Sequence, residues 1–164
     1  MLTGSYASSL HGTPRATQDL DLVVAPSRTQ LSALLNLLPD TDYYVSPDAA
    51  FDALASRSQF NVIDFATGWK IDFIIVKDRE FSRQEFQRRK VQELDGLAFS
   101  VASPEDVLVA KLEWAKLGES DRQIEDAAGI LRVQGTELDA AYVERWVKDL
   151  GLAVQWEQAK ARAA

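Results

Sequence analysis

The sequence predicts an α/β (α+β) fold in which helices flank a small mixed β-sheet and a C-terminal helical region follows. Up to residue 102, short β-rich runs alternate with amphipathic helical segments that begin at Ser or Pro capping signals. Ser103-Pro104-Glu105-Asp106 then opens a helix, and only helical spacing follows. With 164 residues and 46% hydrophobic content, the chain can build a packed core. We therefore expect an α/β core over residues 1–102 and a helical region over residues 103–164.

Local spacing predicts each element of the first part. The acid–apolar alternation of Asp19 to Val24 is typical of a strand, and Ala66-Thr67-Gly68 separates two β-rich runs as a hairpin turn does. Capping boxes and Ser-Pro starts predict the helices. In order, we expect a very short strand before Gly4, a helix over 6–12, a strand over 19–24, a helix from Ser27 with Leu31, Leu34, Leu35 and Leu38 on one face, a short helix from Pro47, strands over 60–65 and 69–76, a helix from Ser82 and a strand over 97–102.

The second part should contain only helices. The first runs from Pro104 to Gly118, and a capping pair formed by Ser120 and Gln123 starts the next. A third carries Tyr142, Val143, Trp146, Val147 and Leu150, and residues 154–164 could extend a last, frayed helix. Trp114 and Trp146 fall at apolar helical positions, so we expect both in the core.

Composition excludes several kinds of site. The chain has no cysteine and one histidine, so disulfides, thiolate metal sites and histidine-rich zinc sites are excluded, and any metal must be held by oxygen. No stretch is long and apolar enough for a membrane span, and the start lacks a signal sequence, so we expect a cytoplasmic protein with no membrane contact. The net charge of −7 argues against a broad DNA-binding surface.

Two further polar features favour ordinary structural roles. His11, on the first short helix, is better explained as a structural hydrogen-bonding residue than as a base. The basic residues Arg83, Arg88, Arg89 and Lys90 fit a solvated face better than an RNA track.

Three aspartates are the candidate metal-binding residues of the sequence. Asp19 and Asp21 are two apart on a predicted strand, so both project from one face. Asp72 interrupts an apolar run typical of a buried strand, where an unpaired charge would cost several kcal/mol. If the strands are neighbours, the carboxylates converge and could bind one or two Mg²⁺ ions. The alternatives are a salt bridge from Lys70 or an arginine to Asp72, and Asp64 as the third acid.

Gly4-Ser5, followed by Asp19-Leu20-Asp21 and later by Asp72 between apolar neighbours, resembles the signature of the DNA polymerase β-like nucleotidyltransferase superfamily. The resemblance covers the α/β region. It implies that the backbone of Gly4 and Ser5 holds a triphosphate, that Asp19 and Asp21 bind Mg²⁺, and that Asp72 binds one metal ion and helps to activate a hydroxyl. An NTP would then donate its NMP group to a protein, a tRNA or a small molecule.

A narrower resemblance is to bacterial minimal and toxin-type nucleotidyltransferases of toxin–antitoxin and abortive-infection systems. It rests on residues 2–12 and 15–23, and more loosely on 103–106, 111–112 and 121–126. It implies that Lys111 lies near the nucleotide, with an acid further along, and that a toxin or antitoxin protein is a partner. Arg15 is a second candidate for phosphate binding. Solvated or snorkelling side chains are the alternative for both residues.

Two other functions stay open. Only three residues precede Gly4, where such enzymes usually have a helix and a full strand, so an inactive module of the same fold that binds a partner protein is the second hypothesis. Metal-dependent phosphoester hydrolysis would use the same acids but lacks the additional histidine ligands common in such sites.

Overall fold

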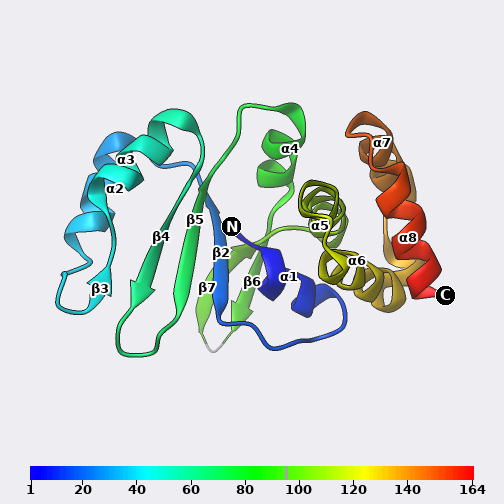
Figure 1. Cartoon of the computed structure of the whole chain (residues 1–164), viewed down its shortest axis with the longest axis horizontal. Coiled ribbons are helices and arrows are strands. Elements are labelled where there is room, and N and C mark those ends of the chain that lie inside the picture. Colours follow the sequence, from blue (N-terminus) through cyan, green and yellow to red (C-terminus); the bar gives the residue numbers. More distant parts are fainter. Residues whose placement is uncertain (95) are drawn as a thin grey trace.

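A seven-stranded mixed sheet and eight α-helices make up the part of the chain that the computed structural model describes, residues 1–94 and 96–164 (Figure 1). The predicted fold class, a mixed sheet with helices and a helical C-terminal region, is confirmed. The elements are, in order, β1 (Leu2–Thr3), α1 (Gly4–His11), β2 (Asp19–Val24), α2 (Arg28–Asn36), β3 (Tyr43–Tyr44), α3 (Pro47–Ser56), β4 (Gln59–Asp64), β5 (Lys70–Ile75), α4 (Glu80–Arg88), β6 (Lys90–Leu94), β7 (Leu97–Val101), α5 (Pro104–Gly118), α6 (Asp121–Gln134), the 3₁₀ turn η1 (Gly135–Glu137), α7 (Ala140–Asp149) and α8 (Ala153–Ala163).

The strand order β3-β4-β5-β2-β1-β7-β6 puts β2 at the centre of the sheet. Strand β2 pairs in parallel with β5 and antiparallel with β1, and β1 pairs in parallel with β7. The predicted hairpin of β4 and β5 is present, and β6 and β7 form a second hairpin. Because β2 and β5 are neighbours, acids on these two strands can meet.

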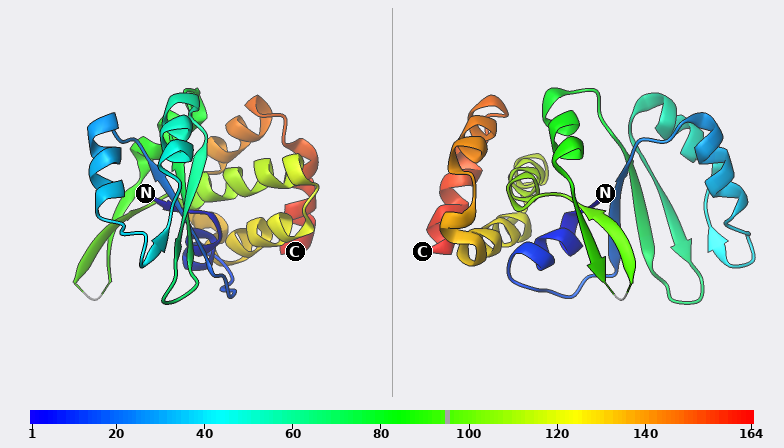
Figure 2. Two further views of the ribbon diagram at one scale, coloured as in Figure 1. Left: turned by 60° about the vertical axis from the view of Figure 1, so that its left-hand side comes forward. Right: turned by 180° about the vertical axis from the view of Figure 1, so that it is seen from behind.

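Helices cover the sheet in two groups (Figures 1 and 2). Helices α2 and α3 lie beside β3 and β4 and share one hydrophobic cluster with β4 and β5. Helices α5 to α8 pack with α1, β1, α4 and β7 around a second, larger cluster. Residues on both sides of position 102 therefore share a core, and the division of the chain at that position stays a prediction. None of the helices in these described ranges is long and apolar enough to cross a bilayer.

Helix α4 differs from its predicted limits. It begins at Glu80, with Arg79 at the N-cap, rather than at Ser82. Ser82 lies inside the first turn, where its hydroxyl accepts a hydrogen bond from Arg79 Nε at 2.9 Å. It ends at Arg88, and the basic stretch after it enters strand β6. Arg88 itself is not part of a solvated face, since it pairs with the buried Glu105 and Asp106.

Strands β3 and β6 were not predicted, and both lie at the edges of the sheet. Each pairs with one neighbour only, β3 with β4 and β6 with β7. Their own sequences lack a clear period of two, so pairing with an adjacent strand decides their conformation. Ser120 is at the N-cap of α6 as expected, but its side chain makes no capping hydrogen bond.

Candidate functional site

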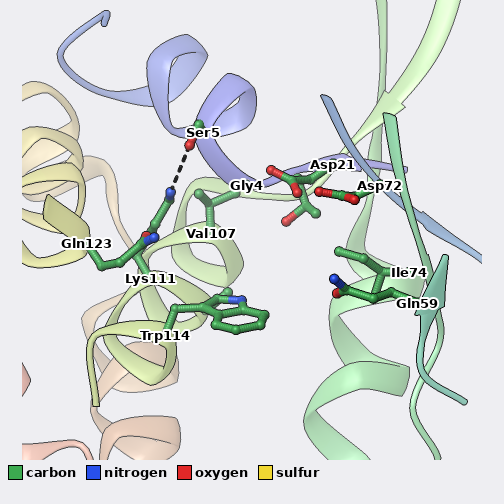
Figure 3. Close-up of a pocket in the computed structure, with 12 residues that line it drawn as sticks. Gly4, Ser5, Asp21, Gln59, Asp72, Ile74, Val107, Lys111, Trp114 and Gln123 are labelled. Carbon is green, nitrogen blue, oxygen red and sulfur yellow. Dashed lines mark hydrogen bonds between the residues drawn. The ribbon is translucent and has the colours of Figure 1, made fainter. Parts of the chain in front are cut away.

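Asp21 and Asp72 lie next to each other on β2 and β5. The parallel register sets the two residues directly opposite, so both side chains leave the same face of the sheet. Asp72 is 8% exposed, and Asp21 is partly buried. Figure 3 shows both carboxylates at one cavity, beside Gly4. The convergence of acids from these two strands, on which the sequence argument depends, is therefore present for this pair.

The electrostatic environment of Asp21 disfavours its charged form. Burial raises its pKa, and the negative charge of Asp72 raises it further. The backbone amide of Ser5 has the opposite effect, because it favours the ionised carboxylate. A cation between the two carboxylates would relieve the repulsion, as would uptake of a proton.

Lys70 already supplies one positive charge. Its Nζ lies 2.6 Å from Asp72 Oδ2, and this hydrogen bond raises the pKa of Lys70. The pair is the salt bridge that the sequence left open as an alternative for Asp72. The side chain of Lys70 is 42% exposed, whereas that of Asp72 is 11% exposed, so the lysine approaches from the solvent side.

Asp19 and Asp64 occupy different environments from this pair. Asp19 shares the face of Asp21 on β2, but it is exposed and does not line the cavity. Asp64 accepts hydrogen bonds from the amide of Ala66 and the hydroxyl of Thr67, which lowers its pKa and holds it in the β4–β5 turn. Within residues 1–94 and 96–164, no group of three or more Asp, Glu or His side chains is arranged to hold a metal ion. Asp21 and Asp72 still fit Mg²⁺, which commonly uses one or two carboxylates together with water and phosphate oxygens.

Gly4 begins helix α1 with its backbone in the left-handed region, at φ +63°. A Cβ atom at this position would lie 1.9 Å from Asp21 Oδ2, so only glycine allows this close approach. The start of α1 therefore sits directly beside the carboxylates. The backbone amides of its first turn favour negative charge, and that of Ser5 already faces the Asp21 carboxylate.

Ser5 connects the start of α1 to a buried ionic network. Arg15 donates hydrogen bonds from Nη2 to the Ser5 hydroxyl and from Nε to Asp126 Oδ1, the latter at 2.7 Å. Lys111 Nζ lies 2.7 Å from Asp126 Oδ2 and 3.5 Å from Ser5 Oγ. Two cations thus share one carboxylate beside the cavity, which leaves a net positive charge where a phosphate could bind.

The cavity has a volume of about 190 Å³ and is lined by most of the predicted site residues together with others, whereas Asp19 and Arg15 are not in its lining. Trp114 is a correction to the sequence analysis, because it is 49% exposed and lines the cavity, whereas Trp146 is buried as expected. Asp126 lies in the segment 121–126 but is not among the residues predicted for the site, and no sequence signal indicates Gln59. The lining consists of Thr3, Gly4, Ser5, Asp21, Gln59, Asp72, Ile74, Val107, Ala110, Lys111, Trp114 and Gln123.

His11 lies outside this cavity. Its Nε2 is 2.8 Å from the carbonyl oxygen of Ala102, and its own carbonyl accepts a hydrogen bond from Gln134. These contacts link α1 to the segment before α5 and to the end of α6. They agree with the structural role expected for His11.

Comparison with known proteins bears on the fold. No protein-family model and no curated protein matches the chain. Among solved structures, an antigenic nucleotidyltransferase-like protein from Paracoccidioides brasiliensis is similar, with a TM-score of 0.50 and 16% sequence identity over 96% of this chain and 83% of that one. At this identity the similarity concerns the backbone fold and not the chemistry. The chain therefore has a nucleotidyltransferase-like fold.

Proposed function

We propose that the protein is a Mg²⁺-dependent nucleotidyltransferase that transfers NMP from an NTP to a hydroxyl group of a protein, a tRNA or a small molecule. The observation that carries the proposal is the position of Asp21 opposite Asp72, at a cavity that also holds the start of α1. The nucleotidyltransferase-like fold supports it. The similarity of residues 2–12 and 15–23 to toxin-type members supports a role in a toxin–antitoxin or abortive-infection system, with a toxin or antitoxin protein as partner.

In this proposal, the residues at and beside the cavity bind either Mg²⁺ or the triphosphate. Asp21 and Asp72 would hold Mg²⁺, with Asp19 as an outer carboxylate on the same face, and the ion would supply positive charge beside the transferring phosphate. The amides of Gly4 and Ser5 bind the triphosphate, and the positive pair Arg15 and Lys111 attracts it.

The transfer itself requires an unprotonated carboxylate near the acceptor. The acceptor oxygen forms a bond to the α-phosphorus, the bond from that phosphorus to the pyrophosphate oxygen breaks, and pyrophosphate leaves. Asp72 accepts the hydroxyl proton. Before this transfer, Lys70 must release Asp72, and the exposed side chain of Lys70 has room to move away.

The proposal predicts nucleotide-dependent labelling that needs both acids. We expect wild-type protein with Mg²⁺ and an α-³²P-labelled NTP to label itself, a partner protein or tRNA, and Asp21→Asn and Asp72→Asn to lower the rate by about two orders of magnitude or more. Asp64→Asn is the matched control, because Asp64 is bonded within the β4–β5 turn. Equal labelling by wild type and both site variants would contradict the proposal.

A specific observation favours a second candidate, an inactive module of this fold that binds a partner protein. Lys70 neutralises Asp72, the amide of Ser5 faces Asp21, and Asp19 lies outside the cavity lining. Charged side chains that already pair with each other do not require a metal ion or a phosphate to compensate their charge. This candidate predicts no labelling and no Mg²⁺-dependent NTP binding by wild-type protein, and the same result for Lys70→Ala, in which Asp72 is released.

A further inference from the structure

Trp114 presents a large aromatic surface to the cavity. It lies on α5 one turn after Lys111, so both side chains leave the same face of the helix, about 4.5 Å apart along its axis. Unlike Lys111, which is 3% exposed, the indole is 49% exposed. An aromatic ring that is left open to solvent beside charged groups is a typical surface for a flat ligand.

The wall across from Trp114 combines an apolar and an amide side chain. Gln59 on β4 is the register partner of Ile74 on β5, and both line the cavity. Figure 3 shows this pair facing the indole. Gln59 is exposed at the start of β4 and lines the cavity, so the donor and acceptor of its side-chain amide can meet a ligand.

Gln123 adds an unsatisfied acceptor to the same cavity. Its Oε1 is buried and has no hydrogen-bond partner among the described residues. A buried carboxamide oxygen normally accepts a hydrogen bond, because leaving it unpaired is destabilising. The cavity thus offers a flat apolar surface with amide groups on two of its sides.

We propose that Trp114 and the wall formed by Gln59 and Ile74 are the nucleobase subsite. The base lies against the indole, and the carboxamide of Gln59 meets its polar edge. This inference rests on the proposed function, since the phosphates are assigned to the start of α1 and to the Mg²⁺ that Asp21 and Asp72 would hold. It adds a binding site for the nucleobase, which an NTP has and an inorganic polyphosphate lacks.

The test compares a ligand that has a base with one that lacks it. Calorimetric titration uses Mg²⁺ with α,β-methylene-ATP, which cannot transfer AMP, and Mg²⁺ with inorganic tripolyphosphate. We expect Trp114→Ala to weaken binding of the ATP analogue by about tenfold or more and tripolyphosphate binding by less than about twofold. Trp114→Phe should restore most of the affinity for the analogue, because a smaller ring still stacks. Val154→Ala, at an exposed apolar position on α8, is the control and should change neither.

The outcomes separate this inference from the proposed function. If wild-type protein binds both ligands and Trp114→Ala binds the ATP analogue as tightly as wild type, the base subsite is wrong and the phosphate site stands. Equal loss of both ligands in Trp114→Ala overturns the subsite as well, because it indicates a structural role for the indole. Wild-type protein that binds neither ligand overturns the proposed function and the subsite together.

Discussion

Gly4 illustrates how a single residue controls the candidate site. Its positive φ and its distance from Asp21 are independent constraints, and either would disfavour a side chain. Gly68 has a similar backbone, at φ +72°, but a Cβ atom there would have nothing within 4 Å. Comparison of Gly4 with Gly68 therefore distinguishes the cost of backbone strain from the cost of a steric clash.

A substitution at each glycine should give different results. We expect Gly68→Ala to lower the free energy of unfolding by about 1–2 kcal/mol, which is the cost of a left-handed alanine. Gly4→Ala should cost more and should also weaken binding of Mg²⁺-tripolyphosphate, because the new methyl group displaces the Asp21 carboxylate. Urea unfolding and calorimetry measure the two effects. Equal stability of the two variants would show that the contact with Asp21 imposes no constraint.

At the scale of elements, a buried polar cluster joins α4, α5 and α7. Asp106 is fully buried and accepts hydrogen bonds from Arg88 Nε at 3.1 Å, the Ser103 hydroxyl at 2.7 Å and the Tyr142 hydroxyl at 2.6 Å. The guanidinium of Arg88 also lies over the Tyr142 ring, 3.9 Å from its centroid. These charge-assisted hydrogen bonds therefore fix the ends of α4, α5 and α7 relative to one another, in addition to apolar packing.

Glu85 on α4 should make stability depend on pH. Burial raises its pKa to about 8, and the charge of Asp106 adds to the effect, while Arg79 opposes it. Because the folded protein holds this proton and the unfolded chain releases it near pH 4.5, stability should fall as pH rises from about 4.5 to about 8. Glu85 alone contributes a loss of up to about 1.4 kcal/mol per pH unit.

Glu85→Gln isolates this contribution. The variant keeps a neutral polar side chain, so its unfolding free energy should decline less than that of wild type between pH 5 and pH 8, about the range bounded by the two pKa values. Urea unfolding at several pH values measures the difference. A wild-type and a variant curve that run parallel over this range would show that Glu85 titrates normally.

At the scale of the whole molecule, the ionic network around Asp126 ties the N-terminal part to the C-terminal helices. Arg15 follows α1, Lys111 is on α5, and Asp126 is on α6. Burial lowers the pKa of Lys111, against the raising effect of its bond to Asp126. Burial alone would raise the pKa of Asp126, but the hydrogen bonds from Arg15 and Lys111 lower it. Each partner therefore depends on the other for its charge.

Removal of the shared carboxylate should be strongly destabilising. We expect Asp126→Ala to lower the unfolding free energy by about 3–5 kcal/mol, because it leaves Lys111 buried without an anion. Asp121→Ala on the same helix is the control and should cost at most about 1 kcal/mol, since its carboxylate is almost fully exposed. Adding Lys111→Met to Asp126→Ala should recover much of the loss. A double variant as unstable as Asp126→Ala would contradict this account.

Local signals predicted much of the fold and part of the site. The Ser27–Gln30 capping box and the Ser46-Pro47 helix start are present, because capping is a contact between near neighbours in sequence. The edge strands β3 and β6 were missed because pairing with a neighbouring strand decides them. The start of α4 was missed because its N-cap is Arg79, which makes no side-chain capping hydrogen bond and gives no capping signal. Trp114 was assigned to the core, since helical spacing shows which positions share a face but not which face is covered.

The sequence alone determined the order of most elements, the mixed character of the fold and the strands that carry Asp21 and Asp72. These follow from short-range periodicity and from the cost of burying an unpaired charge. Only the tertiary structure decided that β5 lies beside β2, that Lys70 neutralises Asp72, and that Asp126 joins Lys111 to Arg15. Such contacts depend on strand order and helix packing, which arise from interactions between residues far apart in the chain.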